Sequence, residues 1–152
     1  MSVVARLEED ALHPEHELGA LLDRAKGDGA VVSFTGVARA TSTGGQNVDR
    51  LILEHHPTMT QQSLEDIANA AAAKFDVSHV HVVHRRGDVA AGEPIVFAGA
   101  AALHRRSAFE AADYLMDRLK TEAVFWKREV GSQGSNWIEP TEADYAGRER
   151  WR

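Results

Sequence analysis

The chain has 152 residues, a formal net charge of −6 and no cysteine. The acidic balance argues against a broad surface for nucleic acids or anionic membranes, and the missing cysteines exclude disulfides, thiolate metal sites and covalent catalysis through sulfur. There is neither a run of about 18 apolar residues nor a basic, apolar leader at Met1–Asp10, so we expect a cytoplasmic protein.

The first half of the chain predicts alternating strands and helices. Pro14 suits the first turn of a helix, and Gly27 supplies its stop. The segment Ala40–Asn47 is rich in Thr, Ser and Gly, so we expect a mobile surface loop able to close over a ligand. The predicted elements are a strand at Val3–Leu7, a helix at Pro14–Ala25, strands at Gly29–Val37 and Val48–His55, and a helix from Thr58 or Thr60 to Phe75.

The second half predicts two more strands, a long helix, a hairpin and a terminal helix. The run Pro94–Leu103 is almost wholly apolar, which favours a central strand covered on both faces. Phe125 and Trp126 are neighbours in a later strand, so only one of them can face the core. The predicted elements are a strand at His79–His84, a turn at Gly87–Gly92, the strand Pro94–Leu103, a helix from Ser107 to Lys120, a hairpin of Val124–Val130 and Asn136–Glu139, and a helix at Thr141–Trp151 capped by Thr141. Together they predict a single α+β domain over residues 1–152.

Cationic and aromatic residues gather between residues 104 and 129. Lys120 ends the predicted long helix and Lys127 lies in the strand after it, so we expect both to be partly desolvated and to point into one concave site. Burial and neighbouring cations lower the pKa of a lysine and make it a useful acid, base or nucleophile. In the plainer interpretation, Lys120 is a solvated helix residue near Asp117 and Lys127 is an exposed strand residue.

A local anion site is predicted where the apolar strand meets the long helix. His104, Arg105 and Arg106 lie at this junction, where free backbone N–H groups and the helix dipole favour a phosphate. Cations at that end oppose the dipole, which favours a functional explanation over simple pairing with Glu110. Arg39, just before the Thr/Gly-rich loop, is either a further phosphate ligand or a solvated loop residue.

Other kinds of site receive little support. His79 and His81 would share one strand face, but no HExxH spacing and no cysteine accompany them, so we expect no metal site. The glycine loops that bind nucleotide phosphates and the GxSxG elbow of serine hydrolases are also missing.

An ordered set of motifs over about residues 29–139 resembles the large, catalytic subunit of molybdopterin synthase, the MoaE family. The set comprises Gly29–Gly36, Arg39, Leu53–His56, Met59, His84–Gly87, Gly92-Glu93, His104-Arg105, Lys120, Phe125–Glu129 and Trp137. The resemblance implies an α/β hammerhead core with an additional small antiparallel β subdomain.

The resemblance also implies a reaction and partners. The family converts cyclic pyranopterin monophosphate to molybdopterin, in molybdenum cofactor biosynthesis, by installing two sulfurs. Each sulfur arrives as a thiocarboxylate on the C-terminal Gly-Gly tail of a small ubiquitin-like sulfur carrier. A homodimer of large subunits with a carrier at each end, a heterotetramer, is implied, and no cofactor. A chain without cysteine fits this chemistry, because the carrier brings the sulfur.

By position in these motifs, Lys120 and Lys127 would be the catalytic pair, and the residues leave open which lysine assists attack and which positions or protonates the substrate. The rival hypothesis is a non-catalytic scaffold subunit that uses the same basic pocket to hold a phosphorylated ligand or a partner's C-terminal tail.

The same motifs imply the binding residues. Arg39, His104 and Arg105 would hold the substrate phosphate and the terminal carboxylate of the carrier through charge-assisted hydrogen bonds. Phe34 and Met116 would shape the wall of the channel or pocket, and a role in the core is equally compatible with their positions.

Overall fold

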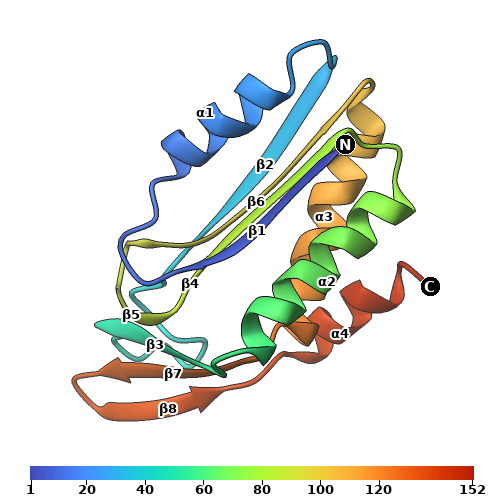
Figure 1. Cartoon of the computed structure of the whole chain (residues 1–152). Helices are drawn as coiled ribbons and strands as arrows, with labels where there is room; N and C mark the ends of the chain where they lie inside the picture. Colours follow the sequence, from blue (N-terminus) through green and yellow to red (C-terminus); the bar gives the residue numbers. More distant parts are fainter.

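The structure, a computed structural model that describes residues 1–152, contains eight strands and four helices (Figure 1). The strands form two sheets, and this mixture confirms the predicted α+β class. In chain order the elements are β1 (Ser2–Glu8), α1 (Pro14–Arg24), β2 (Ala30–Val37), β3 (Arg50–His55), α2 (Met59–Lys74), β4 (His79–Arg85), β5 (Gly87–Ala90), β6 (Pro94–Ala102), α3 (Arg105–Glu122), β7 (Phe125–Gly131), β8 (Gly134–Ile138) and α4 (Glu142–Glu149).

The larger sheet has the strand order β1-β4-β6-β2, in which β1 and β4 are parallel and the other neighbours are antiparallel. Helix α1 packs on one face, and α2 and α3 pack on the other (Figure 1). Strand β6 is buried from Val96 to Ala102, which confirms the prediction of a central strand covered on both faces. Gly99 in this strand leaves room for α1, because a Cβ there would lie 2.7 Å from Cδ2 of Leu21.

The smaller sheet has the strand order β5-β3-β7-β8 and is antiparallel throughout. It lies at one end of the larger sheet, at the bottom of Figure 1. The predicted turn at Gly87–Gly92 is wrong in its first part, because Gly87–Ala90 is strand β5 and pairs with β3. Both end glycines have the positive φ of turn residues, but Val89 between them is fully buried against Leu51 and Leu53. Burial of this valine outweighs the local turn chemistry.

The C-terminal helices begin close to their predicted positions. Helix α3 starts at Arg105 rather than Ser107, with His104 as its N-cap. At α4, the Thr141 hydroxyl accepts a hydrogen bond from the N–H of Asp144, and the Asp144 carboxylate accepts one from the N–H of Thr141. This reciprocal capping box confirms Thr141 as the cap.

No helix in the structure combines the length and the apolar character needed to cross a bilayer.

The segment after β8 folds back on α3. The Asp117 carboxylate accepts hydrogen bonds from Nη2 of Arg150 and Nε1 of Trp151, each at 2.7 Å. The Trp151 ring makes edge contacts with Phe75, the C-cap residue of α2, and with Tyr114 of α3. The C-terminus is therefore fixed to both helices of its own chain.

Candidate active site

Lys127 lies in the middle of β7 and faces the inner side of the smaller sheet. It pairs across the sheet with Leu53 of β3 and Ile138 of β8, and directly opposed residues share a face. Phe125, two residues earlier, also points inward, whereas Trp126 is 51% exposed, as the alternation predicts. Lys127 thus projects among apolar side chains that contribute to the local core.

This burial changes the acid–base character of Lys127. Desolvation is the main cause that lowers its pKa from 10.5 to about 8, and the nearby charge of Lys120 acts in the same direction. The Asp144 carboxylate partly offsets both effects by favouring the ammonium. Lys127 can therefore give up and take back a proton close to neutral pH.

Lys120 differs from this pattern. It lies in the last turn of α3 and is exposed, so the prediction that both lysines are desolvated is right for Lys127 and wrong for Lys120. Lys120 lies at the C-terminal end of α3, where the helix dipole attracts a cationic side chain. The charge of Lys120 lowers the pKa of Lys127, so the two amines lie close enough for their charges to interact.

The link between the two lysines is anchored to the first turns of α2. The hydroxyl of Thr60, which is fully buried, donates to the carbonyl of Val124 at 2.5 Å. The hydroxyl of Ser63 accepts from the N–H of Val124 at 3.1 Å. Two bonds to the residue just before β7 thus set the position of Lys127 relative to the end of α3.

His84, at the end of β4, is a neighbour that carries no role in the sequence-based site. It is 4% exposed, and its ring stacks on Phe125 with the centroids 4.2 Å apart. Burial is the main cause that lowers its pKa to about 3, and the charges of Lys127 and Lys120 act in the same direction. The hydrogen bond to the Arg85 carbonyl acts against them. A polar ring at the end of a buried strand, immediately before two arginines, is the signal that marks it in the sequence.

Arg39 lies at the same end of the fold as the lysines. It is exposed, and the preceding Ala38 is buried in the core of the smaller sheet with Leu51 and Leu53. The following loop is closed by hydrogen bonds, among them one from the N–H of Ser42 to the carbonyl of Gln46 at 2.9 Å. An exposed guanidinium beside a folded loop is compatible with the predicted phosphate contact.

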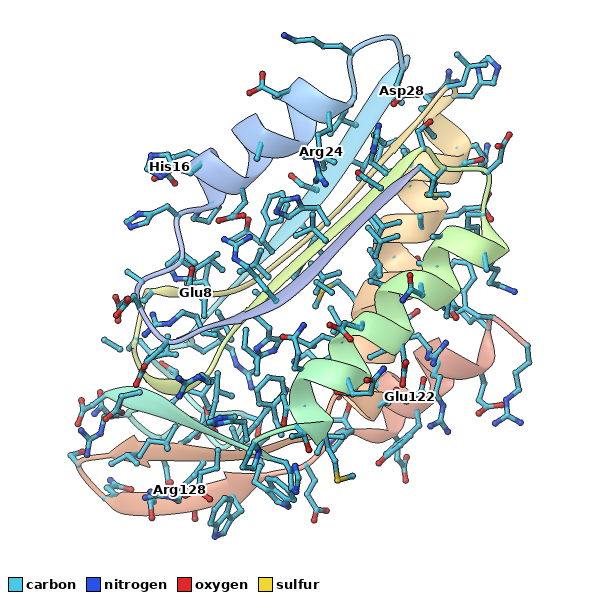
Figure 2. The ribbon with its side chains drawn as sticks, in the orientation of Figure 1. Glu8, His16, Arg24, Asp28, Glu122 and Arg128 are labelled. Carbon is cyan, nitrogen blue, oxygen red and sulfur yellow. The ribbon has the colours of Figure 1, made fainter.

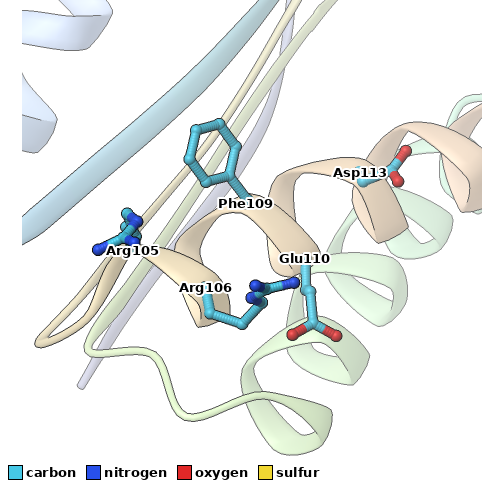
Figure 3. Close-up of a pocket in the computed structure, with 5 residues that line it drawn as sticks. All are labelled: Arg105, Arg106, Phe109, Glu110 and Asp113. Carbon is cyan, nitrogen blue, oxygen red and sulfur yellow. The ribbon is translucent and has the colours of Figure 1, made fainter.

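His104 and Arg105 lie at the opposite end of α3. Fifteen residues of helix separate Arg105 from Lys120, which is about 22 Å at 1.5 Å per residue. One chain therefore does not bring all the predicted cations into one pocket. The expectation that it does is wrong, because residues at the two ends of a straight helix lie far apart even when they are close in sequence. A hollow of about 460 Å³ beside Arg105 is lined by Arg106, Phe109, Glu110 and Asp113 as well (Figure 3).

The two apolar residues of the predicted site differ in exposure. Phe34 on β2 is 45% exposed, so it does not belong to the core. Met116 is half-buried and packs against the main core, one helical turn before Lys120. Phe34 is thus free to contact a ligand or another chain. Met116 contributes to the core, which is one of the two roles that its position in the sequence allows.

The histidines of β4 form hydrogen bonds with neighbouring side chains and backbone. His81 contacts Glu17 through Nε2 at 2.9 Å and Arg24 through Nδ1 at 2.5 Å, and Figure 2 shows Arg24 between α1 and the sheet. His81 is buried, and burial is the main cause that lowers its pKa. One exposed group on the first turn of α1, His13, Glu15 and His16, places possible ligand atoms within 4.8 Å of one another, remote from the lysines.

Comparison with known proteins decides the family. The sequence model of the family described as MoaE protein matches residues 7–122. This chain belongs to the MoaE family. Among its MoaE relatives, the molybdopterin synthase catalytic subunit of Caulobacter vibrioides is 48% identical over 123 residues, 81% of this chain and 80% of that protein. The catalytic subunit of Pseudomonas aeruginosa is 41% identical over 146 residues, 96% of this chain and 97% of that protein.

Solved MoaE structures share the fold. The molybdopterin biosynthesis MoaE protein of Burkholderia ambifaria superposes with a TM-score of 0.81 at 35% identity, covering 99% of this chain and 98% of that chain. Molybdopterin synthase from Staphylococcus aureus gives a TM-score of 0.75 at 25% identity, covering 88% and 96%. The two-sheet architecture described above is therefore that of the MoaE family.

Proposed function

We propose that this chain is the catalytic subunit of a molybdopterin synthase, a sulfurtransferase that converts cyclic pyranopterin monophosphate to molybdopterin. The observation that carries the proposal is a desolvated lysine, Lys127, held beside a second lysine, Lys120, in a chain of the MoaE family. The chain has no cysteine, so the sulfur has to come from a partner.

The partner in this proposal is a small sulfur carrier whose C-terminal Gly-Gly ends in a thiocarboxylate. Molybdopterin synthase from Staphylococcus aureus has this fold, and a solved Helicobacter pylori structure with the same fold is described as a complex of subunits 1 and 2 of the molybdopterin-converting factor. A Gly-Gly tail has no side chains, so it can enter a narrow passage towards the lysines. We place the reaction in the cytoplasm.

The lysines divide the chemistry by their charge. In each transfer the thiocarboxylate sulfur bonds to a pterin carbon and the carbon–oxygen bond at that carbon breaks, with loss of water or, at a carbon of the cyclic phosphate ester, with opening of that ester. One water then hydrolyses the acyl link, which leaves a thiol on the pterin and a carboxylate on the carrier. Lys127, with a pKa of about 8, is suited to accept and return the protons of these steps. Lys120, exposed and cationic, is suited to position the substrate and to stabilise developing negative charge.

The phosphate ligands in this proposal come from two copies of the chain. Arg39 lies at the lysine end of its own chain, whereas His104 and Arg105 lie about 22 Å from Lys120 along α3. If all three hold one substrate, His104 and Arg105 have to serve the lysines of the other copy in a homodimer. Phe34, exposed on β2, and Met116, beside Lys120, would then line the wall of the pocket.

A single-turnover assay tests the function. Wild type and the variants Lys120→Ala, Lys127→Ala and Lys26→Ala are mixed with cyclic pyranopterin monophosphate and thiocarboxylated carrier, and dithiolene formation is followed by mass spectrometry. We expect product with wild type and with the exposed-lysine control Lys26→Ala, and loss of product with the other two while carrier binding persists. If folded wild type binds the carrier and forms no product, the synthase is excluded and the scaffold hypothesis takes its place.

Mixing two inactive variants tests the shared site. Each mixed dimer of Lys127→Ala and Arg105→Ala chains has one site with both residues intact and one with neither. An equimolar random mixture should therefore recover about a quarter of wild-type activity. Recovery no greater than the sum of the separate variants would show that Arg105 acts on the lysines of its own chain or not at all.

A further inference from the structure

His84 is a buried titratable group next to the lysines that the proposed mechanism does not use. Its face of β4 is shared with Val80 and Val82, which belong to the core beneath α2 and α3. His84 continues this row at the end of the strand, where its ring lies against Phe125 of the smaller sheet. It therefore joins the two sheets at the strand that carries Lys127.

The spacing along β7 brings Lys127 near the same ring. Phe125 and Lys127 lie on one face, two residues or about 7 Å apart along the strand. The His84 and Phe125 rings are stacked, with an angle of 26° between their planes. The Lys127 side chain extends from the neighbouring inward position, and its charge is felt at His84.

The hydrogen bonding of His84 fixes its tautomer. Nδ1 lies 2.8 Å from the carbonyl oxygen of Arg85, which can only accept, so Nδ1 carries the proton. A neutral imidazole in this state has a lone pair on Nε2. With a pKa of about 3, the ring remains neutral throughout the pH range in which Lys127 titrates.

The charged groups around His84 come from three elements. Lys127 on β7 and Lys120 on α3 both act on its pKa, and Asp144 on α4 acts on Lys127. His55 lies opposite Phe125 on β3. The Arg85 side chain takes no part, because successive strand residues face opposite sides and its guanidinium donates to the carbonyls of Glu9 and Asp88. Two cations, one carboxylate and the neutral acceptor of His84 therefore lie around this point.

We propose that His84 is a positioning residue for the sulfur transfer, and that its Nε2 accepts a hydrogen bond from the Lys127 amine when the carrier is bound. An amine that donates one hydrogen to a fixed acceptor keeps its lone pair in a defined direction. Lys127 is the partner rather than Lys120, since Lys127 is half-buried and faces Leu53 and Ile138, whereas Lys120 is exposed. In the unliganded chain no hydrogen bond joins the two groups, and the Lys127 charge acts only by lowering the pKa of His84. Catalytic hydrogen bonds often form or tighten only in the complex.

The inference rests on the proposed function, and its test includes a measurement that needs no reaction. His84→Phe keeps an aromatic ring on Phe125 and removes the acceptor, whereas His84→Gln supplies an amide oxygen in its place. His79→Gln, on the same strand but the opposite face, is the matched control. All are studied in complex with the carrier, with folding checked by circular dichroism.

The first readout is the pKa of Lys127, measured by NMR of its 13Cε in the complex with unactivated carrier. Loss of an acceptor disfavours the ammonium, so we expect His84→Phe to titrate at lower pH than wild type and His84→Gln to lie near wild type. This readout does not depend on turnover, so it stands even if the synthase assay yields no product. An unchanged Lys127 titration in folded His84→Phe would overturn the proposal.

The second readout is the single-turnover rate. We expect His84→Phe to slow sulfur transfer about 10- to 100-fold with carrier and substrate affinities unchanged, His84→Gln to regain most of the rate, and His79→Gln to match wild type. A His84→Gln variant as slow as His84→Phe would show that the ring is needed only for packing. If His84→Phe does not fold, the Lys127 titration in His84→Gln and in a His84→Leu variant decides the same question.

Discussion

Replacing Lys127 by methionine should stabilise the protein while it abolishes sulfur transfer. The native fold lowers the pKa of Lys127 from 10.5 to about 8, mainly because burial disfavours the ammonium. Each unit of such a difference is worth about 1.4 kcal/mol, so the charged form costs the fold about 3 kcal/mol, which partial access to water reduces to about 2 kcal/mol. Methionine has similar length and suits the apolar contacts with Leu53 and Ile138.

The sign follows from proton linkage. Below about pH 8, Lys127 is charged in both the folded and the unfolded state, and the folded state bears the full cost of the buried charge. Between about pH 8 and 10.5 the unfolded chain holds a proton that the folded chain has lost, so wild-type stability rises with pH in this window. The advantage of Lys127→Met should therefore be largest at pH 7 and small near pH 10.

Urea denaturation at pH 7 and at pH 10 measures this difference. The exposed residue Lys26 provides the control, and Lys26→Met should change the free energy of unfolding by less than about 0.5 kcal/mol at both values. Two results would refute the idea of a desolvated lysine. One is a Lys127→Met variant that is less stable than wild type at pH 7, and the other is a difference in the free energy of unfolding that is the same at pH 7 and at pH 10.

Three further substitutions test the supports of the site. Thr60→Val leaves two backbone groups without their buried partner and should cost about 2 to 3 kcal/mol in urea unfolding, with slower sulfur transfer. Gly131→Ala would place a Cβ 1.9 Å from the carbonyl oxygen of Asn47 and should lower Tm by about 5 °C in a calorimetric scan. Asp117→Ala removes the acceptor of Trp151 and the nearer of the two carboxylates that accept from Arg150, and it should speed trypsin cleavage of the C-terminal segment about tenfold, with the rest of the fold unchanged.

The sequence predicts most elements because their local signals and their burial agree. The apolar run of β6 and the Thr141 cap of α4 are examples, since the residues of the run are themselves buried and the Thr141 side chain itself forms the capping bond. β5 is missed because its glycines carry a turn signal while Val89 responds to a partner strand far away in the sequence. Only the pairing with β3 decides whether Gly87–Ala90 forms a turn or a strand.

The site is predicted less completely, for a similar reason. The pair Lys120 and Lys127 follows from the order of helix and strand, but which of them is buried depends on Leu53 and Ile138 across the sheet. The sequence does not reveal the role of His84, because its contact with Phe125 joins two residues 41 positions apart in the chain, and a local pattern carries no information on such a contact. Contacts between elements, rather than the elements themselves, are what the sequence leaves undetermined.

The register of β1 has a practical consequence for preparing the protein. Ser2 pairs with His79, which pairs in turn with Ala101, so the N-terminus emerges at the end of the sheet where α3 begins (Figure 1). A histidine tag fused before Met1 would hang beside His104 and Arg105 and add imidazoles where a substrate phosphate is proposed to bind. Arg152 is exposed and follows a segment that packs on α2 and α3. An affinity tag is therefore better placed after Arg152, away from His104 and Arg105.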